Sequence, residues 1–284
     1  MGSSILTTHV GSLPRSKELS ELLFAKDKKE NFNQETFNQV VQKNVEEVVK
    51  RQLKAGIDVI SDGEMSKISY ATYVKDRIKG FSGESERRAP ADLDAFPDYK
   101  MKIANSGGTP TYTRPCCTSE LEIQDEESLK TDIENFSKAL NANGHSKAFM
   151  NAASPGVINV FMPNKFYQND DEYLEKLSNI MSAEYKTIIK NNLHLQLDCP
   201  DLALARHMNY KDLSDEDFLQ RAEKQIEALN HALSGIPRDQ VRMHICWGNY
   251  EGPHIFDIGL EKILPIILKA RVKYLLLSLI HISE

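Results

Sequence analysis

The feature that most constrains the fold of this chain is a regular alternation of short apolar runs with long amphipathic stretches. Short runs rich in Val, Ile and Leu are typical of buried strands, and apolar residues at helical spacing predict helices between them. The pattern predicts strands over 5–10, 57–61, 121–124, 147–153, 194–199, 241–247 and 273–278. It predicts helices over 34–55, 65–79, 128–141, 171–191, 214–233 and 259–270.

Repeated strand–helix units predict an α/β protein with a parallel sheet. A (β/α)8 TIM-type barrel suits a chain of 284 residues as a single domain over 1–284. About seven strands can be counted, so the barrel is expected to be incomplete. The polar segment from about 80 to 118 holds four prolines and interrupts the alternation. It is expected to be a long insertion of the kind that often covers a substrate.

The composition of the chain limits which classes of binding partner are expected. The chain has 41 acidic and 35 basic residues, a net charge of -6, which argues against a nucleic-acid partner. No apolar run reaches the ~18 residues of a membrane span, so no membrane partner is expected. The four cysteines lack the spacing of a disulfide framework, and the first residues lack a secretory signal. These observations favour a cytoplasmic protein.

A metal site is indicated by His244 and Cys246, which lie two residues apart on a predicted strand and therefore share one face. Imidazole and thiolate are ligands that Zn²⁺ prefers. Two ligands do not close a tetrahedral site, so further ligands must come from elsewhere. The alternative is that both are ordinary core residues, since free cysteine is often buried.

Polar residues also follow other predicted strands, where barrel enzymes place their sites. Glu64 comes after the second strand, and Asp198 ends the strand that begins at His194. Gln196 and Asp198 share one face of that strand, which a buried barrel strand would normally keep apolar. The alternative reading of each carboxylate is a residue that braces a loop or caps a helix.

Four segments match one family in its own order: Thr7–Arg15 (TTHVGSLPR), Gly56–Glu64 (GIDVISDGE), Leu195–Pro200 (LQLDCP) and Met243–Asn249 (MHICWGN). On these segments the chain resembles the C-terminal catalytic domain of cobalamin-independent methionine synthase, particularly its single-domain relatives. The resemblance implies a (β/α)8 barrel that binds Zn²⁺. It also implies transfer of a methyl group from 5-methyltetrahydrofolate, in its polyglutamate form, to homocysteine.

The resemblance also implies roles for individual residues. His244 and Cys246 become the first two zinc ligands, and Phe161 becomes an aromatic residue on the folate side, with a plain core residue as the alternative. The homocysteine site is implied to contain Gly11, Ser12, Glu64 and Asp198. Zinc suits this chemistry because a free thiol has a pKa near ~8.5, and coordination deprotonates it.

The chain departs from the family after its last predicted strand. The third zinc ligand of the family, a Glu, falls at about Ser278, while the fourth ligand and the proton-donating His fall beyond residue 284. The chain is therefore interpreted as C-terminally truncated, with the native reading frame lost near Val272. The replacement ligands that the remaining tail offers are His281 and Glu284.

Three other functions remain open at this point. A related zinc enzyme of the coenzyme M type would activate a different thiol, and would use the same His244 and Cys246. An inactive truncated fragment would bind no metal. A barrel of the porphyrinogen decarboxylase type needs no zinc, and the His-x-Cys pair counts against it. The methyl donor is either methylated folate or another donor.

Overall fold

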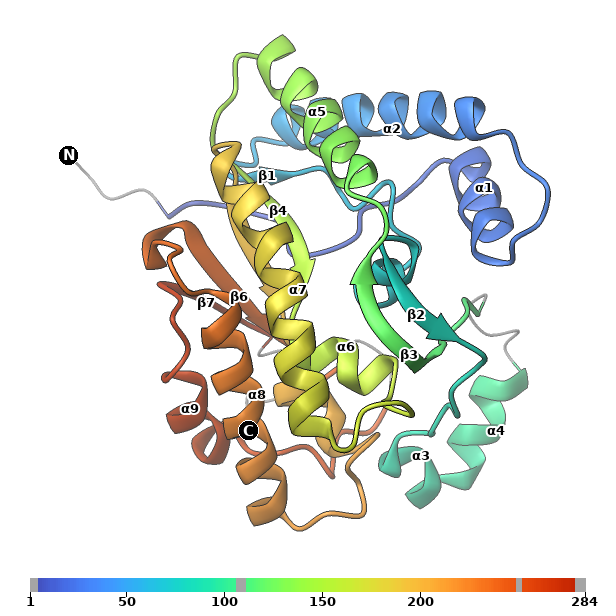
Figure 1. Cartoon of the computed structure of the whole chain (residues 1–284), viewed down its shortest axis with the longest axis vertical. Helices are drawn as coiled ribbons and strands as arrows, with labels where there is room; N and C mark the ends of the chain where they lie inside the picture. Colours follow the sequence, from blue (N-terminus) through green and yellow to red (C-terminus); the bar gives the residue numbers. More distant parts are fainter. Residues whose placement is uncertain (1–4, 106–110, 249–251, 279–284) are drawn as a thin grey trace.

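A computed structural model describes residues 5–105, 111–248 and 252–278. Its centre is a curled parallel sheet of five strands, in the order β1-β4-β5-β6-β7 (Figure 1). The strands are β1 (Ile60–Ser61), β4 (Ala148–Ala153), β5 (His194–Asp198), β6 (Val241–Ile245) and β7 (Tyr274–Leu277). Helices connect them, as the alternation predicts. The predicted fold class, an incomplete α/β barrel, is therefore confirmed.

Long amphipathic helices cover the outside of the sheet. They are α1 (Lys17–Asp27), α2 (Gln34–Lys54), α5 (Glu127–Ala142), α7 (Asp170–Lys190), α8 (Asp215–Ala232) and α9 (Leu260–Ile267). Helix α2 packs on β1 and α7 packs on β4 and β5, so the outward side chains Leu195 and Leu197 are fully buried. Helix α8 begins where the sequence predicts, because Ser214 accepts a hydrogen bond from the Asp217 amide.

The segment predicted as an insertion contains part of an antiparallel hairpin and two short helices. Strands β2 (Ile78–Ser82) and β3 (Cys116–Ile123) pair with each other and not with the central sheet. Between them lie α3 (Ala91–Ala95) and α4 (Pro97–Asn105), which Figure 1 shows beyond the end of the hairpin. Two of the seven described strands therefore lie outside the barrel-like sheet.

Two predicted elements were wrong. The strand over 5–10 is reduced to one isolated bridge between Thr8 and Val59. The helix over 65–79 is absent, and only a 3₁₀ turn, Thr72–Asp76, and the start of β2 occupy that range. The Ser69 hydroxyl accepts hydrogen bonds from the amides of Ala71 and Thr72, which competes with helix formation.

The remaining short elements lie near the strand ends. Helix α6 (Pro155–Phe161) follows β4 directly, and 3₁₀ turns occupy Pro200–Leu202, Leu204–Arg206 and Arg238–Gln240. Within the part of the chain that the structure describes, no helix has the length and apolar character needed to cross a bilayer.

A buried ion-pair network joins the hairpin to the helices around the sheet. Arg77, which precedes β2, donates to Asp132 of α5 at 2.5 Å and lies 3.1 Å from Glu184 of α7. The Tyr73 hydroxyl donates to the same Glu184 at 2.5 Å. All three charged side chains are at most 9% exposed. Such a network is costly to break, because removing one partner leaves unpaired charges in the interior.

Replacing Arg77 with Leu should therefore destabilise the protein by about 3–5 kcal/mol, because two buried carboxylates lose their positively charged partner. Urea unfolding followed by circular dichroism measures this change. The matched control is Arg51→Leu, which removes a surface ion pair with Glu47 whose side chains are 69% and 55% exposed. The control should change the free energy of unfolding by less than about 1 kcal/mol. Equal effects of the two substitutions would contradict the role given to Arg77.

Candidate functional site

A cavity of about 500 Å³ opens at the carboxyl ends of the parallel strands. Six of the residues singled out from the sequence line it: Gly11, Ser12, Glu64, Asp198, His244 and Cys246. They come from four separate segments of the chain. The structure therefore brings together residues that lie more than 230 positions apart in sequence, at the end of the sheet where barrel proteins place their sites.

His244 is held in a form that suits metal binding. It lies on β6 beside Leu276 of β7, and its Nδ1 donates a hydrogen bond to the Leu276 carbonyl at 3.1 Å. That bond places the proton on Nδ1 and leaves the Nε2 lone pair available. Burial lowers the pKa of His244, which favours the neutral imidazole that a metal requires.

Cys246 lies just past the end of β6 and is half-buried. Its sulfur accepts a hydrogen bond from the Gly248 amide at 3.3 Å. Burial raises the pKa of the thiol, although bonds from Gly248 and Ser278 oppose the rise. A bound cation would reverse this shift, because metal-bound cysteine is a thiolate.

Glu64 and Asp198 form a buried carboxylate pair in the same cavity, with Asp198 beside His244 across the β5–β6 pairing. The Asn151 side-chain amide of β4 donates to Glu64 Oε1 at 2.9 Å and to Asp198 Oδ2 at 3.0 Å. Ser12 donates to the second oxygen of Glu64, and Gln196 donates to the second oxygen of Asp198 at 3.0 Å. All four carboxylate oxygens are therefore held in fixed positions.

The two carboxylates resist ionisation together. Burial and the nearby Asp198 charge raise the pKa of Glu64, and burial raises the pKa of Asp198 to about 6. The Lys67 ammonium lowers both values. Glu64 also has a φ of 57°, a left-handed conformation that costs a non-glycine residue about 1–2 kcal/mol. Strain of this kind concentrates at functional sites.

A layer of polar side chains lies beneath this pair. Asn151, Gln196 and Arg242 are register partners on β4, β5 and β6, and so face the same side of the sheet. Their amides donate to the Val10 carbonyl, at 3.0 Å from Asn151 and 2.6 Å from Gln196, and Arg242 donates to His9 at 3.0 Å. These bonds hold the 5–10 segment in place of the strand-pairing hydrogen bonds that it lacks. They thereby position Gly11 at the cavity.

One predicted residue lies outside the cavity. Phe161, at the end of α6, is 7% exposed and packs edge-on against Tyr70, with ring centroids 5.6 Å apart. Tyr70 itself lines the cavity. The Arg114 guanidinium lies 4.6 Å from the centre of the Phe161 ring. The aromatic residue that faces the cavity is therefore Tyr70, with Phe161 behind it.

Sequence reasoning missed Asn151 and Tyr70. Tyr70 falls in the segment wrongly predicted as a helix, and Asn151 follows three apolar residues in a strand that is buried throughout. An Asn at a fully buried strand position is the signal that was available. Ser278, where the family's third ligand was expected, does line the cavity. His281 and Glu284 lie outside the described residues.

The fold and cavity together define a class: proteins of the α/β barrel type with a His-x-Cys pair and buried carboxylates in one cavity. Residues 5–89 match the family model described as the catalytic domain of cobalamin-independent synthase. The chain is 28% identical over 263 residues to the methionine synthase of Saccharolobus solfataricus, covering 90% of this chain and 68% of that one. For the methionine synthase of Sulfolobus acidocaldarius the identity is 24%, with 90% and 66% covered.

Solved structures agree in fold. A B12-independent methionine synthase from Shewanella sp. W3-18-1, in complex with selenomethionine, superposes with a TM-score of 0.66 at 16% identity, covering 95% of this chain and 72% of that one. The putative enzyme of the same type from Listeria monocytogenes gives 0.58 at 15%, with 87% and 68% covered. The chain thus spans about two thirds of the length of these relatives. The predicted resemblance to the cobalamin-independent methionine synthases is confirmed, and the chain is a methyltransferase-like enzyme.

A further buried carboxyl, Asp201, supports the backbone next to the site. It follows β5 by three residues and accepts a hydrogen bond from Ser154, the residue that caps α6, at 3.0 Å. Its Oδ2 lies so close to Gly156 that a Cβ there would be 2.0 Å away. Burial raises the pKa of Asp201 to about 7, although the bond from Ser154 opposes the rise.

The free energy of unfolding of Asp201→Asn, relative to that of wild type, should therefore be higher at pH 8 than at pH 4.5. Between these values the native state holds a proton that the unfolded state, with a pKa of ~3.9, has lost, so wild-type stability falls as pH rises toward 7. The variant has no carboxyl to ionise at this position, so its stability does not fall in this way. Its free energy of unfolding relative to wild type should rise by a few kcal/mol between pH 4.5 and pH 8.

Urea unfolding at a series of pH values measures the difference. The control is Asp94→Asn: hydrogen bonds from Lys100 and Lys211 hold the pKa of that carboxyl at about 2, so its effect should not change over this range. A difference between Asp201→Asn and wild type that stays flat from pH 4.5 to 8 would exclude the raised pKa.

Proposed function

We propose that the chain is a zinc-dependent methyltransferase that moves a methyl group from 5-methyltetrahydrofolate polyglutamate to homocysteine, forming methionine. The observation that supports the proposal most strongly is the set of residues that line one cavity. Its walls hold His244 on β6 with Cys246 just after that strand, Asp198 at the end of β5, and Glu64 in the turn after β1. The first pair suits a thiol-activating metal, and the second suits an ammonium group.

The His-x-Cys pair fits zinc on the geometry of this chain. The Nδ1 bond to the Leu276 carbonyl fixes the imidazole with Nε2 free to coordinate, and Cys246 lines the same cavity. Zinc, when bound there, would hold the substrate sulfur as a reactive thiolate at neutral pH.

The carboxylate pair supports an amino-acid substrate. Glu64 and Asp198 are both at most 5% exposed, and each raises the electrostatic cost of ionising the other. An incoming ammonium group would relieve that repulsion and stabilise both carboxylates in their charged form. Homocysteine carries an ammonium and a thiol, so it can meet both pairs of residues.

The methyl donor is proposed to lie against Tyr70, the cavity residue backed by Phe161 and Arg114. An aromatic surface of this kind suits a flat heterocycle such as a pterin. The names of the relatives support methionine as the product, and we propose the cytoplasm as the compartment. The departing nitrogen of the donor needs a proton from a general acid.

Replacing Cys246 with Ser should lower bound zinc and methionine formation together, with activity falling at least about 100-fold, because a ligand to the metal is lost. Zinc is measured by elemental analysis, and methionine by chromatography after incubation with homocysteine and methylated folate. The control is Cys116→Ser, a buried cysteine of the hairpin that does not line the cavity.

The outcomes separate the alternatives. Full activity of Cys246→Ser without zinc would refute the proposed metal site. Methylation of another thiol, such as coenzyme M, with none of homocysteine would keep the metal site and replace the substrate.

Replacing Asn151 with Leu should raise the KM for homocysteine by about tenfold or more while zinc content is unchanged. The substitution removes the donor shared by Glu64 and Asp198, and loss of a hydrogen bond to a buried charged group costs about 1.5–3 kcal/mol. The control is Asn159→Leu, a buried Asn of α6 that does not line the cavity. If both variants show the wild-type KM, Asn151 does not position the carboxylates for substrate.

A further inference from the structure

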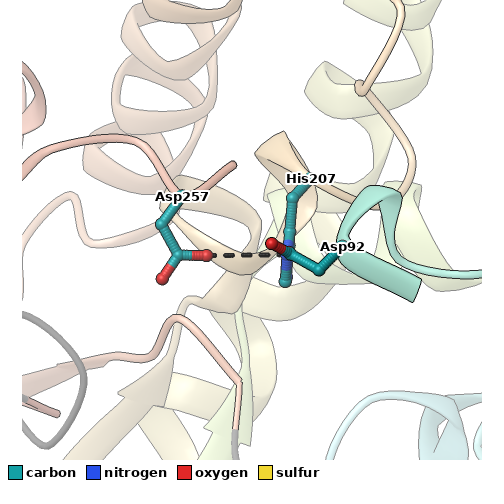
Figure 2. A group of neighbouring side chains, drawn as sticks. All are labelled: Asp92, His207 and Asp257. Atoms are coloured by element: carbon teal, nitrogen blue, oxygen red, sulfur yellow. Dashed lines mark hydrogen bonds and ion pairs between the residues drawn. The ribbon is translucent and has the colours of Figure 1, made fainter. Parts of the chain in front are cut away.

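A second group of metal-ligating side chains lies outside the cavity. Asp92 of α3, His207 and Asp257 come from three segments far apart in sequence, and one ligand atom of each lies within 4.8 Å of the other two. Figure 2 shows the three side chains converging, with His207 beside Asp92 and Asp257 facing them. None of the three lines the cavity described above.

The distances within this Asp92–His207–Asp257 cluster suit a shared ligand. His207 Nδ1 is 2.7 Å from Asp92 Oδ2 and 3.5 Å from Asp257 Oδ1. Ligand atoms bound to one cation at about 2.0–2.2 Å lie roughly 3.3–3.6 Å apart in tetrahedral geometry, so the 3.5 Å separation already fits, while the 2.7 Å hydrogen bond must lengthen when the ion binds. His207 Nδ1 carries at most one hydrogen, so it can donate one well-aligned hydrogen bond to only one carboxylate oxygen. A cation bound between the three side chains could be coordinated by both carboxylates.

Each carboxylate is oriented from outside the cluster. Asp92 Oδ1 accepts hydrogen bonds from the backbone amides of Ile255 at 2.6 Å and Phe256 at 3.2 Å, which turns Oδ2 toward His207. Asp257 Oδ2 lies 3.0 Å from His254 Nδ1, which turns Oδ1 the same way. Outer partners of this kind are what hold the ligands of metal sites in place.

Burial strengthens the case for a cation. The side chains of Asp92 and His207 are fully buried and that of Asp257 is 11% exposed. Two carboxylates in a low-dielectric interior need positive charge close by. A divalent cation supplies two charges at the point where both carboxylates aim.

We infer that Asp92, His207 and Asp257 form a second divalent-metal site, one that joins the insertion to the segment after β6. Its mixed nitrogen and oxygen ligands suit a transition-metal cation such as Zn²⁺ or Mn²⁺ over Ca²⁺ or Mg²⁺, which prefer oxygen alone. Binding displaces the proton from His207 Nδ1 to solvent. The role of the ion is structural, since its three ligands are buried and do not line the cavity of the proposed function.

The test uses the full chain with His244→Ala and Cys246→Ser together, which removes the metal site of the proposed function. After stripping with a chelator, the protein is dialysed against Zn²⁺ or Mn²⁺ and bound metal is measured by elemental analysis. One equivalent of the added metal should bind per chain. Adding Asp92→Asn or Asp257→Asn should weaken binding at least tenfold, and Asp201→Asn, a buried Asp outside the cluster, should not.

A second measurement guards against misfolding of the variants. The melting temperature of the parent should rise with added metal, and that of Asp257→Asn should not, while circular dichroism shows both folded. Absence of stoichiometric metal in the parent would overturn the inference and leave His207 as a hydrogen-bonded residue. Binding that persists in both Asp variants would overturn it too. Because His244 and Cys246 are absent throughout, neither result bears on the proposed function.

Discussion

The candidate site depends on the parallel register of β4, β5 and β6. That register sets Asn151 beside Gln196 and Asp198 beside His244. Side chains alternate between the faces of a strand, so a slip of one residue would turn every one of these groups toward the covering helices. The outward residues Leu195 and Leu197 prevent this slip, because they are fully buried on the face of β5 that α7 covers. The apolar face of the sheet thus fixes the geometry of its polar face.

The buried polar side chains around the carboxylate pair are tolerated because they bond extensively to one another. A single Asn151 amide serves two carboxylates and the Val10 carbonyl. Gln196 donates to Asp198 and accepts from Arg242 at 2.7 Å. Connected networks of this kind favour one arrangement, since any partial rearrangement leaves a buried group unsatisfied. A rigid wall of fixed charge is what an enzyme needs around a small substrate.

The sequence predicted the sheet and much of the site for identifiable reasons. The spacing of His244 and Cys246 places both on one face of a strand, and Asp198 breaks an apolar strand, so local pattern was enough. The roles of Asn151 and Tyr70 are set by contacts with segments more than 45 residues away, which no local pattern encodes. The helix expected over 65–79 failed because its apolar spacing came from side chains buried on irregular backbone around Ser69.

The Asp92–His207–Asp257 cluster and the cavity share the same connecting segments. The amide of Leu204, a residue that lines the cavity, donates to the Cys246 carbonyl at 3.1 Å, and His207 lies three residues further on. Trp247, next to Cys246, is fully buried and donates to the Ile258 carbonyl at 2.7 Å, one residue after Asp257. These two bonds connect the segments that carry the cluster to Cys246 and to its neighbour Trp247. An ion held at the cluster would stiffen the wall that carries this thiol without contacting the substrate.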